Sequence, residues 1–288
     1  GKGLVIIMTD LLSKIFATRQ IRGLKILLAS ILAIAEMLGL VLFDTAVTPR
    51  GQQLNLAGYQ LVLEDNFNGS ALDLTKWEYR ANGPRRAGFN SPNQVFLEDG
   101  NLIIRAEYRA DGEYGAGWYA GMIRSVQEYT RGYYEIRCIV SKGGGFWSAY
   151  WLNARGMASA QASNGGIGGA EIDIFESNNY AGNIFNRNSV THAVHVGGYG
   201  DGLRSEMQGS FKVPKPYTQY NTYGMEWNEK EYIFYINGVE SARTSWQTGV
   251  SQAPEYVIIS EELPGEFSEQ PGFTTDFIVD YVKIDQQL

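Results

Sequence analysis

The chain has 288 residues, enough for one large all-β domain or two smaller ones with a core that needs no crosslinks. Its 24 basic and 31 acidic residues give a net charge of −7, and the basic residues are dispersed, which argues against nucleic acid as a partner. Cys138 is the only cysteine, which excludes internal disulfides and thiolate-rich metal sites, and its place in an alternating apolar run predicts a small buried side chain.

The first fifty residues differ in kind from the rest. Residues 26–43 are almost wholly apolar and follow a basic stretch, which is the order of a secretory signal or an N-terminal anchor. Glu36 lies within the apolar run, where an acid disfavours a stable membrane-spanning helix. We therefore expect residues 1–50 to be a signal peptide, or an N-terminal membrane anchor and linker with the tether at residues 26–43. The protein would then be secreted or held at the cell surface.

Residues 51–288 contain short strand-like runs separated by turn residues, without a long helical period or a fixed repeat. This pattern predicts a single all-β domain, a sandwich or a barrel. The pair Asn237-Gly238 stands between two alternating runs and predicts a two-residue type I′ hairpin turn. The clearest strand-like runs are Leu102–Glu107, Tyr133–Val140, Thr191–Val196, Tyr232–Ile236 and Phe277–Ile284.

Two tryptophans precede the most informative motif of the chain. Trp147 and Trp151 are four residues apart, so on a strand they share one face, where their rings would either stack on sugars or fill the core. The stretch 158–169 is rich in Ala, Ser and Gly and predicts a flexible loop beside a cleft.

The run EIDIFE at residues 171–176 sets three carboxylates among bulky apolar side chains. On a regular strand Glu171 and Asp173 share one face, whereas Glu176 falls on the apolar face. A β-bulge at residues 174–175 would return Glu176 to the side of the other two acids. A bulge only interrupts the hydrogen bonds between two strands, whereas burying an unpaired carboxylate among apolar groups costs far more free energy. We therefore predict that all three acids face one groove.

Carboxyl groups paired across a small gap are what hydrolysis of a glycosidic bond requires. With the bulge, Glu171, Asp173 and Glu176 are three successive side chains on one face of the strand. The carboxyl groups of Glu171 and Glu176 could then approach to the roughly 5 to 5.5 Å expected of a retaining enzyme. Asp173 adds like charge between them, so one Glu should keep its proton near neutral pH and serve as general acid. A calcium site or a chance acidic strand is the alternative explanation of this spacing.

His192 and His195 are three residues apart and therefore face opposite sides of a regular strand. At most one of them can serve the groove, and no third ligand supports a zinc site.

From about residue 59 to the end, the chain resembles glycoside hydrolase family 16, the jelly-roll endo-glycanases that include laminarinases, lichenases, agarases and carrageenases. The motif EIDIFE is similar to the family's E-x-D-x-x-E motif in its bulged form. Three further stretches match in the same order: AGMIRSVQEYTRGYYEIR, GGGFWSAYWL and AVHVGG. The resemblance implies that residues 51–288 form a catalytic β-jelly-roll sandwich of two antiparallel sheets with a concave substrate cleft.

The resemblance also implies roles for individual residues. Glu171 would be the nucleophile, Glu176 the acid/base, and Asp173 the residue that tunes the pair. No cofactor is required for this chemistry. Substrate-binding side chains would be Trp147, Trp151, Arg124 and His195.

Asp280, in the terminal strand, corresponds to a residue through which some family members bind one structural calcium. The resemblance therefore implies a calcium ligand at Asp280, helped by backbone carbonyls near Asn66 and Gly100. The alternative is a hydrogen-bonded carboxylate at the edge of the sheet.

Glu261 and Glu262 stand where many relatives carry other residues. Acids in the cleft would repel sulfated galactans, so we expect a neutral glucan with β-1,3 or β-1,3-1,4 linkages as the substrate. The expected enzyme is a monomeric endo-glycoside hydrolase that cleaves by double displacement with two Glu residues. Three alternatives stay open: a glucan-binding lectin on the same scaffold, a transglycosylase, and a galactanase acting on agar or carrageenan.

Overall fold

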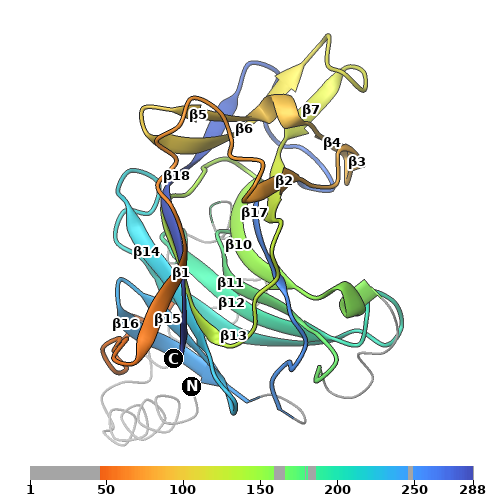
Figure 1. Ribbon diagram of the computed structural model, residues 1–288. Helices are drawn as coiled ribbons and strands as arrows, with labels where there is room; N and C mark the ends of the chain where they lie inside the picture. The colour runs from red at the N-terminus through yellow and green to blue at the C-terminus, as the bar shows by residue number, and fades with distance from the viewer. Residues whose placement is uncertain (1–45, 159–165, 179, 181–185, 246–248, 288) are drawn as a thin grey trace, which may run out of the picture. The chain divides into compact units, whose positions relative to one another are not determined.

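The computed structural model describes residues 46–158, 166–178, 180, 186–245 and 249–287 (Figure 1). In this part the chain forms two β-sheets and two short 3₁₀ helices, η1 (Pro92–Gln94) and η2 (Arg155–Ala158). The predicted signal or anchor lies outside the described residues, as does most of the predicted loop at 158–169. No helix among the described residues is long and apolar enough to cross a membrane.

The first sheet, which carries the acidic motif, has seven strands in the described part of the chain, and its ladders are antiparallel. From one edge to the other these are β13 (Arg204–Lys212), β12 (Ser189–Val196), β11 (Glu171–Glu176), β10 (Trp147–Asn153), β17 (Tyr256–Glu262), β8 (Met122–Ser125) and β2 (Trp77–Tyr79).

The second sheet has eleven strands within the described ranges, and its one parallel ladder joins β4 to β7. Its main path is β16 (Val239–Thr244), β15 (Tyr232–Ile236), β14 (Asn221–Trp227), β9 (Gly132–Ile139), β18 (Thr274–Gln287), β6 (Asn101–Arg109), β7 (Gly117–Ala120), β4 (Gly88–Asn90) and β3 (Gly83–Arg85). Off this path, β1 (Tyr59–Asp65) pairs with β18, and β5 (Val95–Glu98) pairs with β6.

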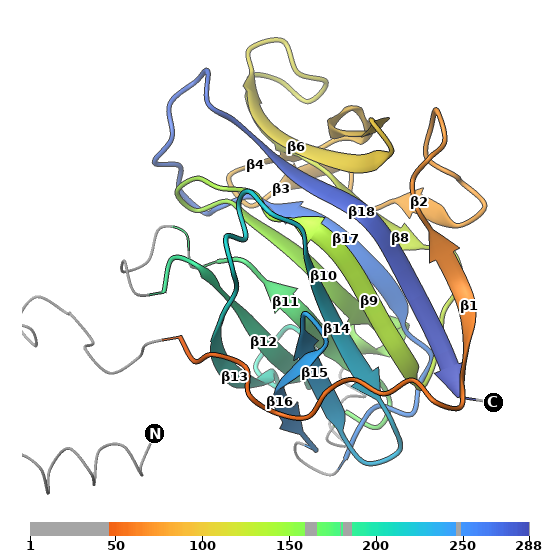
Figure 2. The ribbon, with the colours of Figure 1, turned by 90° about the vertical axis from the view of Figure 1, so that its left-hand side faces the viewer.

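The two sheets pack against each other through apolar side chains, and Figure 2 shows β9, β14 and β18 lying over β10 and β11. Phe175 on β11 stacks on Tyr223 of β14 with ring centroids 4.2 Å apart, and it meets Phe277 of β18 edge-on. Cys138 is fully buried in this core, as its alternating pattern predicted. Burying large aromatic side chains is the main source of stability in such a sandwich.

The local sequence signals are confirmed where they can be checked. All five predicted runs fall on strands, namely β6, β9, β12, β15 and β18, and only Val140 at the end of the second run lies one residue outside its strand. Asn237 and Gly238 join β15 to β16 with φ angles of 51° and 74°, the positive values that a type I′ turn requires.

The described N-terminal segment already contacts the sandwich before the predicted boundary at residue 51. The amide of Ala46 donates to Asn186 Oδ1 at 2.8 Å, and Val47 forms a bridge with Phe211 of β13. Gln53 then pairs with Val239 of β16, so this segment runs along the edges of both sheets.

Candidate active site

The predicted bulge is present in β11. On the partner strand β12, Ala193 pairs with Asp173 and Thr191 pairs with Glu176, so three steps on β11 face two steps on β12. Against β10, Glu171, Asp173 and Glu176 pair with Asn153, Trp151 and Ala149, which alternate on one face of that strand. The extra residue thus brings all three acids to the concave face, while Ile172, Ile174 and Phe175 are buried in the core.

His192 holds the bulge from the opposite face of the sheet. Its Nδ1 bonds the carbonyl oxygen of Ile174, and its ring is stacked between Phe211 and Phe234. Burial lowers the pKa of His192 to about 4, so the ring is neutral, and Nδ1 carries the proton because a carbonyl can only accept. The sequence analysis assigned no role to this residue.

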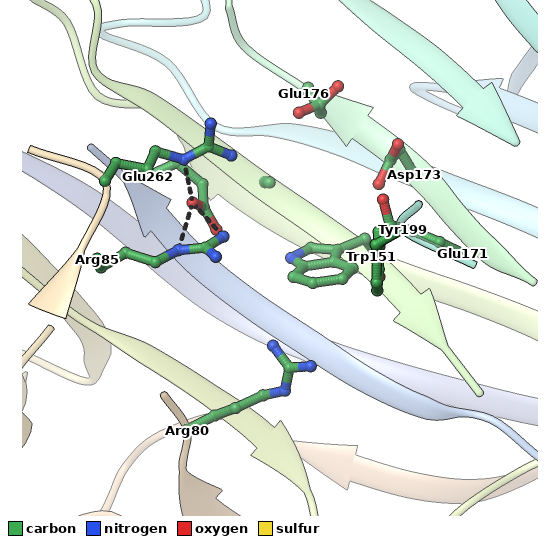
Figure 3. Close-up of a pocket in the computed structure, with 10 residues that line it drawn as sticks. Arg80, Arg85, Trp151, Glu171, Asp173, Glu176, Tyr199 and Glu262 are labelled. Carbon is green, nitrogen blue, oxygen red and sulfur yellow. Dashed lines mark hydrogen bonds and ion pairs between the residues drawn. The ribbon is translucent and has the colours of Figure 1, made fainter. Parts of the chain in front are cut away.

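The three acids line a cavity of about 310 Å³ on the concave face (Figure 3). Glu171, Asp173 and Glu176 occupy one end of this cavity and the arginines, together with Glu262, the other, with Trp151 between them. Its lining consists of Arg80, Arg85, Arg86, Ala149, Trp151, Glu171, Asp173, Glu176, Tyr199 and Glu262.

Glu171 is held through one of its two carboxyl oxygens. Asn153 Nδ2 donates to Oε2 at 3.0 Å, and the hydroxyl of Tyr199 donates to the same atom. Tyr256 fixes the orientation of the Asn153 amide by donating to its Oδ1 at 3.2 Å. Oε1 therefore stays available to attack. Burial, together with the charge of Asp173, raises the pKa of Glu171 to about 7.

Glu176 has the less solvated carboxyl group of the pair. Trp147 Nε1 donates to its Oε1 at 2.9 Å. Burial, and then the charge of Asp173, raises the pKa of Glu176 to about 8, above that of Glu171. Near neutral pH, Glu176 is therefore the carboxyl group that keeps its proton.

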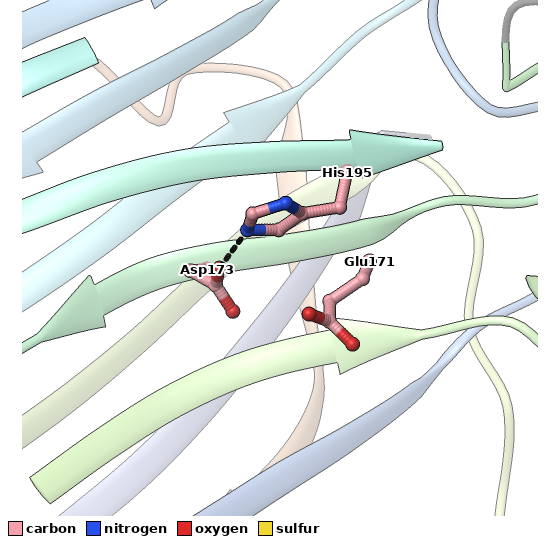
Figure 4. A group of neighbouring side chains, drawn as sticks. All are labelled: Glu171, Asp173 and His195. Atoms are coloured by element: carbon pink, nitrogen blue, oxygen red, sulfur yellow. Dashed lines mark hydrogen bonds and ion pairs between the residues drawn. The ribbon is translucent and has the colours of Figure 1, made fainter. Parts of the chain in front are cut away.

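Asp173 lies between the two Glu residues and is paired with a histidine. His195 Nε2 bonds Asp173 Oδ2 at 2.9 Å (Figure 4). Nδ1 of the same ring bonds Ser205 Oγ at 2.6 Å. Burial lowers the pKa of His195, but its bond to Asp173 and the nearby acids outweigh that effect and raise the pKa. His195 thus faces the acids while His192 faces the core, as the alternation predicted.

Three arginines gather at the other end of the cavity. Arg85 Nη2 and Arg86 Nε lie 2.7 and 3.4 Å from Glu262 Oε2, and the Arg86 guanidinium lies over the ring of Trp147. Arg80 packs against the rings of Trp151 and Tyr256, with its guanidinium carbon 5.3 and 5.5 Å from their centroids. In the part of the chain that the structure describes, no carboxylate forms an ion pair with Arg80.

The expectation that Glu261 and Glu262 make the cleft negative is wrong. Glu261 pairs with Ser148 on the core face, is 1% exposed, and accepts a hydrogen bond from Ser148 Oγ at 2.9 Å. Burial raises its pKa to about 8, so it holds a proton at neutral pH. Glu262 does line the cavity, but two guanidinium groups neutralise it.

Arg124 lies on β8, next to the cavity rather than in its lining. It forms an ion pair with Glu78, and its guanidinium carbon is 4.9 Å from the ring centroid of Tyr256. The arginines that line the cavity come instead from the end of β2 and from the turn between β3 and β4. The sequence analysis missed them, although two adjacent arginines after Pro84 in a turn were a visible signal.

Asp280 is engaged by a cation of the protein itself. Its carboxylate forms an ion pair with Arg137, whose guanidinium lies over the ring of Tyr220. A carboxylate already paired with a guanidinium is a poor fit for a calcium ligand, which agrees with the alternative of a hydrogen-bonded carboxylate. Its expected place at an edge of the sheet is wrong, because β18 pairs with β9 on one side and β6 on the other.

A family model described as the GH16 domain of β-porphyranases A–D matches residues 60–260. The chain belongs to glycoside hydrolase family 16. It is therefore a glycoside hydrolase, an endo-glycanase whose cleft takes a polysaccharide.

Curated relatives are about a quarter identical to this family member over the aligned residues. A β-glucanase of Rhodothermus marinus is 26% identical over 78% of this chain and 85% of that protein. A glucan endo-1,3-β-glucosidase of Niallia circulans is 24% identical, and the match covers 80% of this chain and 38% of the relative. A keratan-sulfate endo-1,4-β-galactosidase of Sphingobacterium multivorum is 27% identical, and the match covers 62% of this chain and 42% of the relative.

Solved structures of the family confirm the predicted jelly-roll sandwich. The endo-β-1,3(4)-glucanase SCLam superposes with a TM-score of 0.68 at 22% identity, covering 85% of this chain and 98% of that one. The laminarinase catalytic domain of Thermotoga maritima superposes with a TM-score of 0.65 at 20% identity, covering 80% of this chain and 99% of that one.

Proposed function

We propose that the protein is a retaining endo-hydrolase of a sulfated galactan of the porphyran type. The observation that carries this proposal is Arg80, a guanidinium held between aromatic rings at the rim of the cavity without a carboxylate partner among the described residues. A guanidinium prefers planar, bidentate pairing with an anion, which a sulfate ester offers and a neutral glucan does not.

The charge balance at this end of the cavity supports an anionic substrate. Arg80, Arg85 and Arg86 face one carboxylate, Glu262, so positive charge remains in excess. The indole of Trp151 lies between these arginines and the acids and gives an apolar face for a sugar ring. A chain lying along the cavity would present a sulfate to the arginines and a glycosidic bond to the acids.

Two of the comparisons agree with this substrate class. The matching family model is named for β-porphyranases. Porphyran is a galactan that carries sulfate esters. A relative at 27% identity acts on keratan sulfate, which is also sulfated. Neutral β-glucan is the second candidate, because two relatives at 24% and 26% identity are named for glucan hydrolysis.

The proposed reaction is a double displacement. Glu171 Oε1 attacks the anomeric carbon while Glu176 gives its proton to the glycosidic oxygen, which leaves with the cleaved chain. Glu176, now a carboxylate, takes a proton from water, which attacks the same carbon and releases the sugar with its configuration retained. Burial, and then the charge of Asp173, raises the pKa of Glu176 and so keeps it protonated in the resting enzyme. A polymeric substrate outside the cell agrees with the predicted export.

A panel of polysaccharides assayed for new reducing ends tests the proposal. We expect porphyran to be cleaved faster than agarose, laminarin, lichenan or barley glucan, and chemically desulfated porphyran to be cleaved slowly. Arg80→Ala should lower kcat/KM on porphyran by about tenfold or more, because a charge-assisted contact is worth about 1.5 to 3 kcal/mol. Arg137→Ala, which changes an arginine away from the cavity, is the matched control. Faster cleavage of laminarin or barley glucan than of porphyran would instead assign the enzyme to glucans.

A further inference from the structure

A second polar pocket lies beside β6 and β7 of the eleven-stranded sheet. It has a volume of about 480 Å³, within the roughly 300 to 1,000 Å³ of typical ligand pockets. Residues of η1, of β7 and of the β6–β7 connection line it, and none of them lines the catalytic cavity. In both Figures 1 and 2, β6 lies away from β11, the strand that carries the three acids of the cleft.

One buried side chain in this pocket has an unused hydrogen-bonding atom. Gln94 is 1% exposed, and its Nε2 donates to Arg105 O at 3.1 Å and to Glu107 Oε1 at 3.3 Å. These two bonds fix the amide, and within the described residues its Oε1 has no hydrogen-bond partner. A buried acceptor without a donor is costly, so a ligand that offers a hydroxyl would be favoured here.

The charges around the pocket select a neutral ligand. Arg109 lines the pocket and forms ion pairs with Glu107 and Asp111, at 3.2 and 3.9 Å. Glu113 is a second carboxylate of the lining, and its Oε2 accepts from Ser91 Oγ at 3.0 Å. A free anion would meet two carboxylates and a free cation would meet a guanidinium. A molecule with many hydroxyl groups can both donate to the acids and accept from the arginine, which is the chemistry of a sugar.

An aromatic rim completes the pocket. Tyr119, which lines it, is stacked on Tyr114 at an interplanar angle of 11°, and Phe89 packs against both rings. Tyr114 is 37% exposed although it is a large aromatic residue. The backbone amide of Tyr114 donates to the hydroxyl of Tyr119, and the contacts of its ring with Tyr119 and Phe89 hold the ring in place. The ring therefore offers an apolar surface to the C–H face of a sugar ring.

We propose that this pocket is a second carbohydrate-binding site, which holds one neutral hexose residue of a glycan chain and keeps a polymeric substrate near the cleft. The proposal rests on the family's polysaccharide substrate but not on the sulfate specificity of the cleft. If the second site failed its test, the proposed sulfate specificity of the cleft would be unaffected. If the sulfate specificity failed, the second site would be unaffected.

Affinity electrophoresis of the full chain tests the site, with Glu171→Gln as the parent so that the gel matrix is not degraded. Porphyran, agarose and laminarin are the three matrices. We expect at least one of them to retard the parent, and Tyr114→Ala to weaken that retardation about threefold to tenfold, the value of one aromatic contact. Arg109→Ala should act in the same direction. Leu74→Ala, which removes an exposed apolar side chain elsewhere, is the matched control.

Activity gives a second readout in the wild-type background. Tyr114→Ala should slow cleavage of the polymer but leave turnover of an oligosaccharide too short to reach both sites unchanged. Melting temperatures of all variants show whether they fold. Equal retardation of Tyr114→Ala and the parent, no retardation of the parent by any matrix, or equal losses on polymer and oligosaccharide would each overturn the second site.

Discussion

Two hydrogen-bond donors on a single oxygen distinguish Glu171 from Glu176. Asn153 and Tyr199 both stabilise the ionised form of Glu171 through Oε2, whereas Glu176 receives one bond, from Trp147. Burial and Asp173 raise both pKa values, to about 7 and about 8, so the difference in hydrogen bonding favours a proton on Glu176. The division into nucleophile and acid thus follows from the neighbours of each carboxyl group.

The pH dependence of kcat/KM should therefore be bell-shaped. Activity requires Glu171 ionised and Glu176 protonated, so it should fall below about pH 7 and above about pH 8. Tyr199→Phe removes a hydrogen bond that lowers the pKa of Glu171, so the acidic limb should move to higher pH while the basic limb stays in place. Initial rates from pH 5 to 10 on a soluble substrate measure both limbs. An acidic limb unchanged in Tyr199→Phe would show that the hydroxyl does not stabilise the Glu171 carboxylate.

The assignment of the acid predicts a dependence on the leaving group. Glu176→Ala should lose nearly all activity on polysaccharide but keep much of it on an aryl glycoside whose phenolate leaves without a proton. Added azide should replace water and give a glycosyl azide of retained configuration, detectable by NMR. Glu171→Gln should be inactive on both substrates and should not respond to azide. If Glu176→Ala lost both activities equally, Glu176 would not be the acid.

At the scale of elements, the bulge depends on a residue of the neighbouring strand. His192 on β12 donates to the carbonyl of Ile174, the group that the interrupted ladder leaves without its regular partner. His192→Phe keeps an aromatic ring between Phe211 and Phe234 but leaves that carbonyl unpaired, at a cost of about 1 to 3 kcal/mol. We expect a lower melting temperature together with a lower kcat, because the bulge sets the position of Glu176.

His192→Asn is the matched rescue variant, since its side-chain amide can still donate to Ile174. It should recover part of the kcat although it loses the aromatic packing. A His192→Phe enzyme with a lowered melting temperature but wild-type kcat would show that the bulge keeps its geometry without this bond.

Local patterns in the sequence predicted the elements well and the cavity only in part. Alternation located strands such as β15, and Asn237-Gly238 located the turn to β16, because both depend on neighbouring residues. The bulge followed from the cost of burying Glu176. Arg85 reaches Glu262 from the other sheet, 177 positions away in the chain, and no local pattern encodes that approach. The same limit led to the wrong orientation of Glu261, which depends on the register of β17.

At the scale of the whole molecule, two acids outside the cleft are buried without a cationic partner among the described residues. These are Glu255 and Glu261, which are enclosed in the interior, whereas Glu171 and Glu176 line the cavity. Glu255 Oε1 accepts from the amide of Ala170, the residue before the catalytic strand, so it helps to fix where β11 begins. Each such group is tolerated in the fold as the neutral acid.

These acids make the stability of the whole protein depend on pH. Burial raises the pKa of Glu255 from 4.5 to about 8, so between these values the folded state holds a proton that the unfolded state has lost. The contribution of the neutral Glu255 to the free energy of unfolding is fully present below pH 4.5 and is lost as the pH rises through 8. Each unit of difference between the folded and unfolded pKa is worth about 1.4 kcal/mol.

Glu255→Gln imitates the neutral acid at every pH and can still accept from Ala170. Its melting temperature should therefore equal that of the parent near pH 4.5 and exceed it increasingly toward pH 8, whereas Glu98→Gln, an exposed control, should follow the parent throughout. Parallel curves for Glu255→Gln and the parent from pH 4.5 to 9, recorded by calorimetry, would mean that Glu255 ionises in the folded protein as readily as in the unfolded chain.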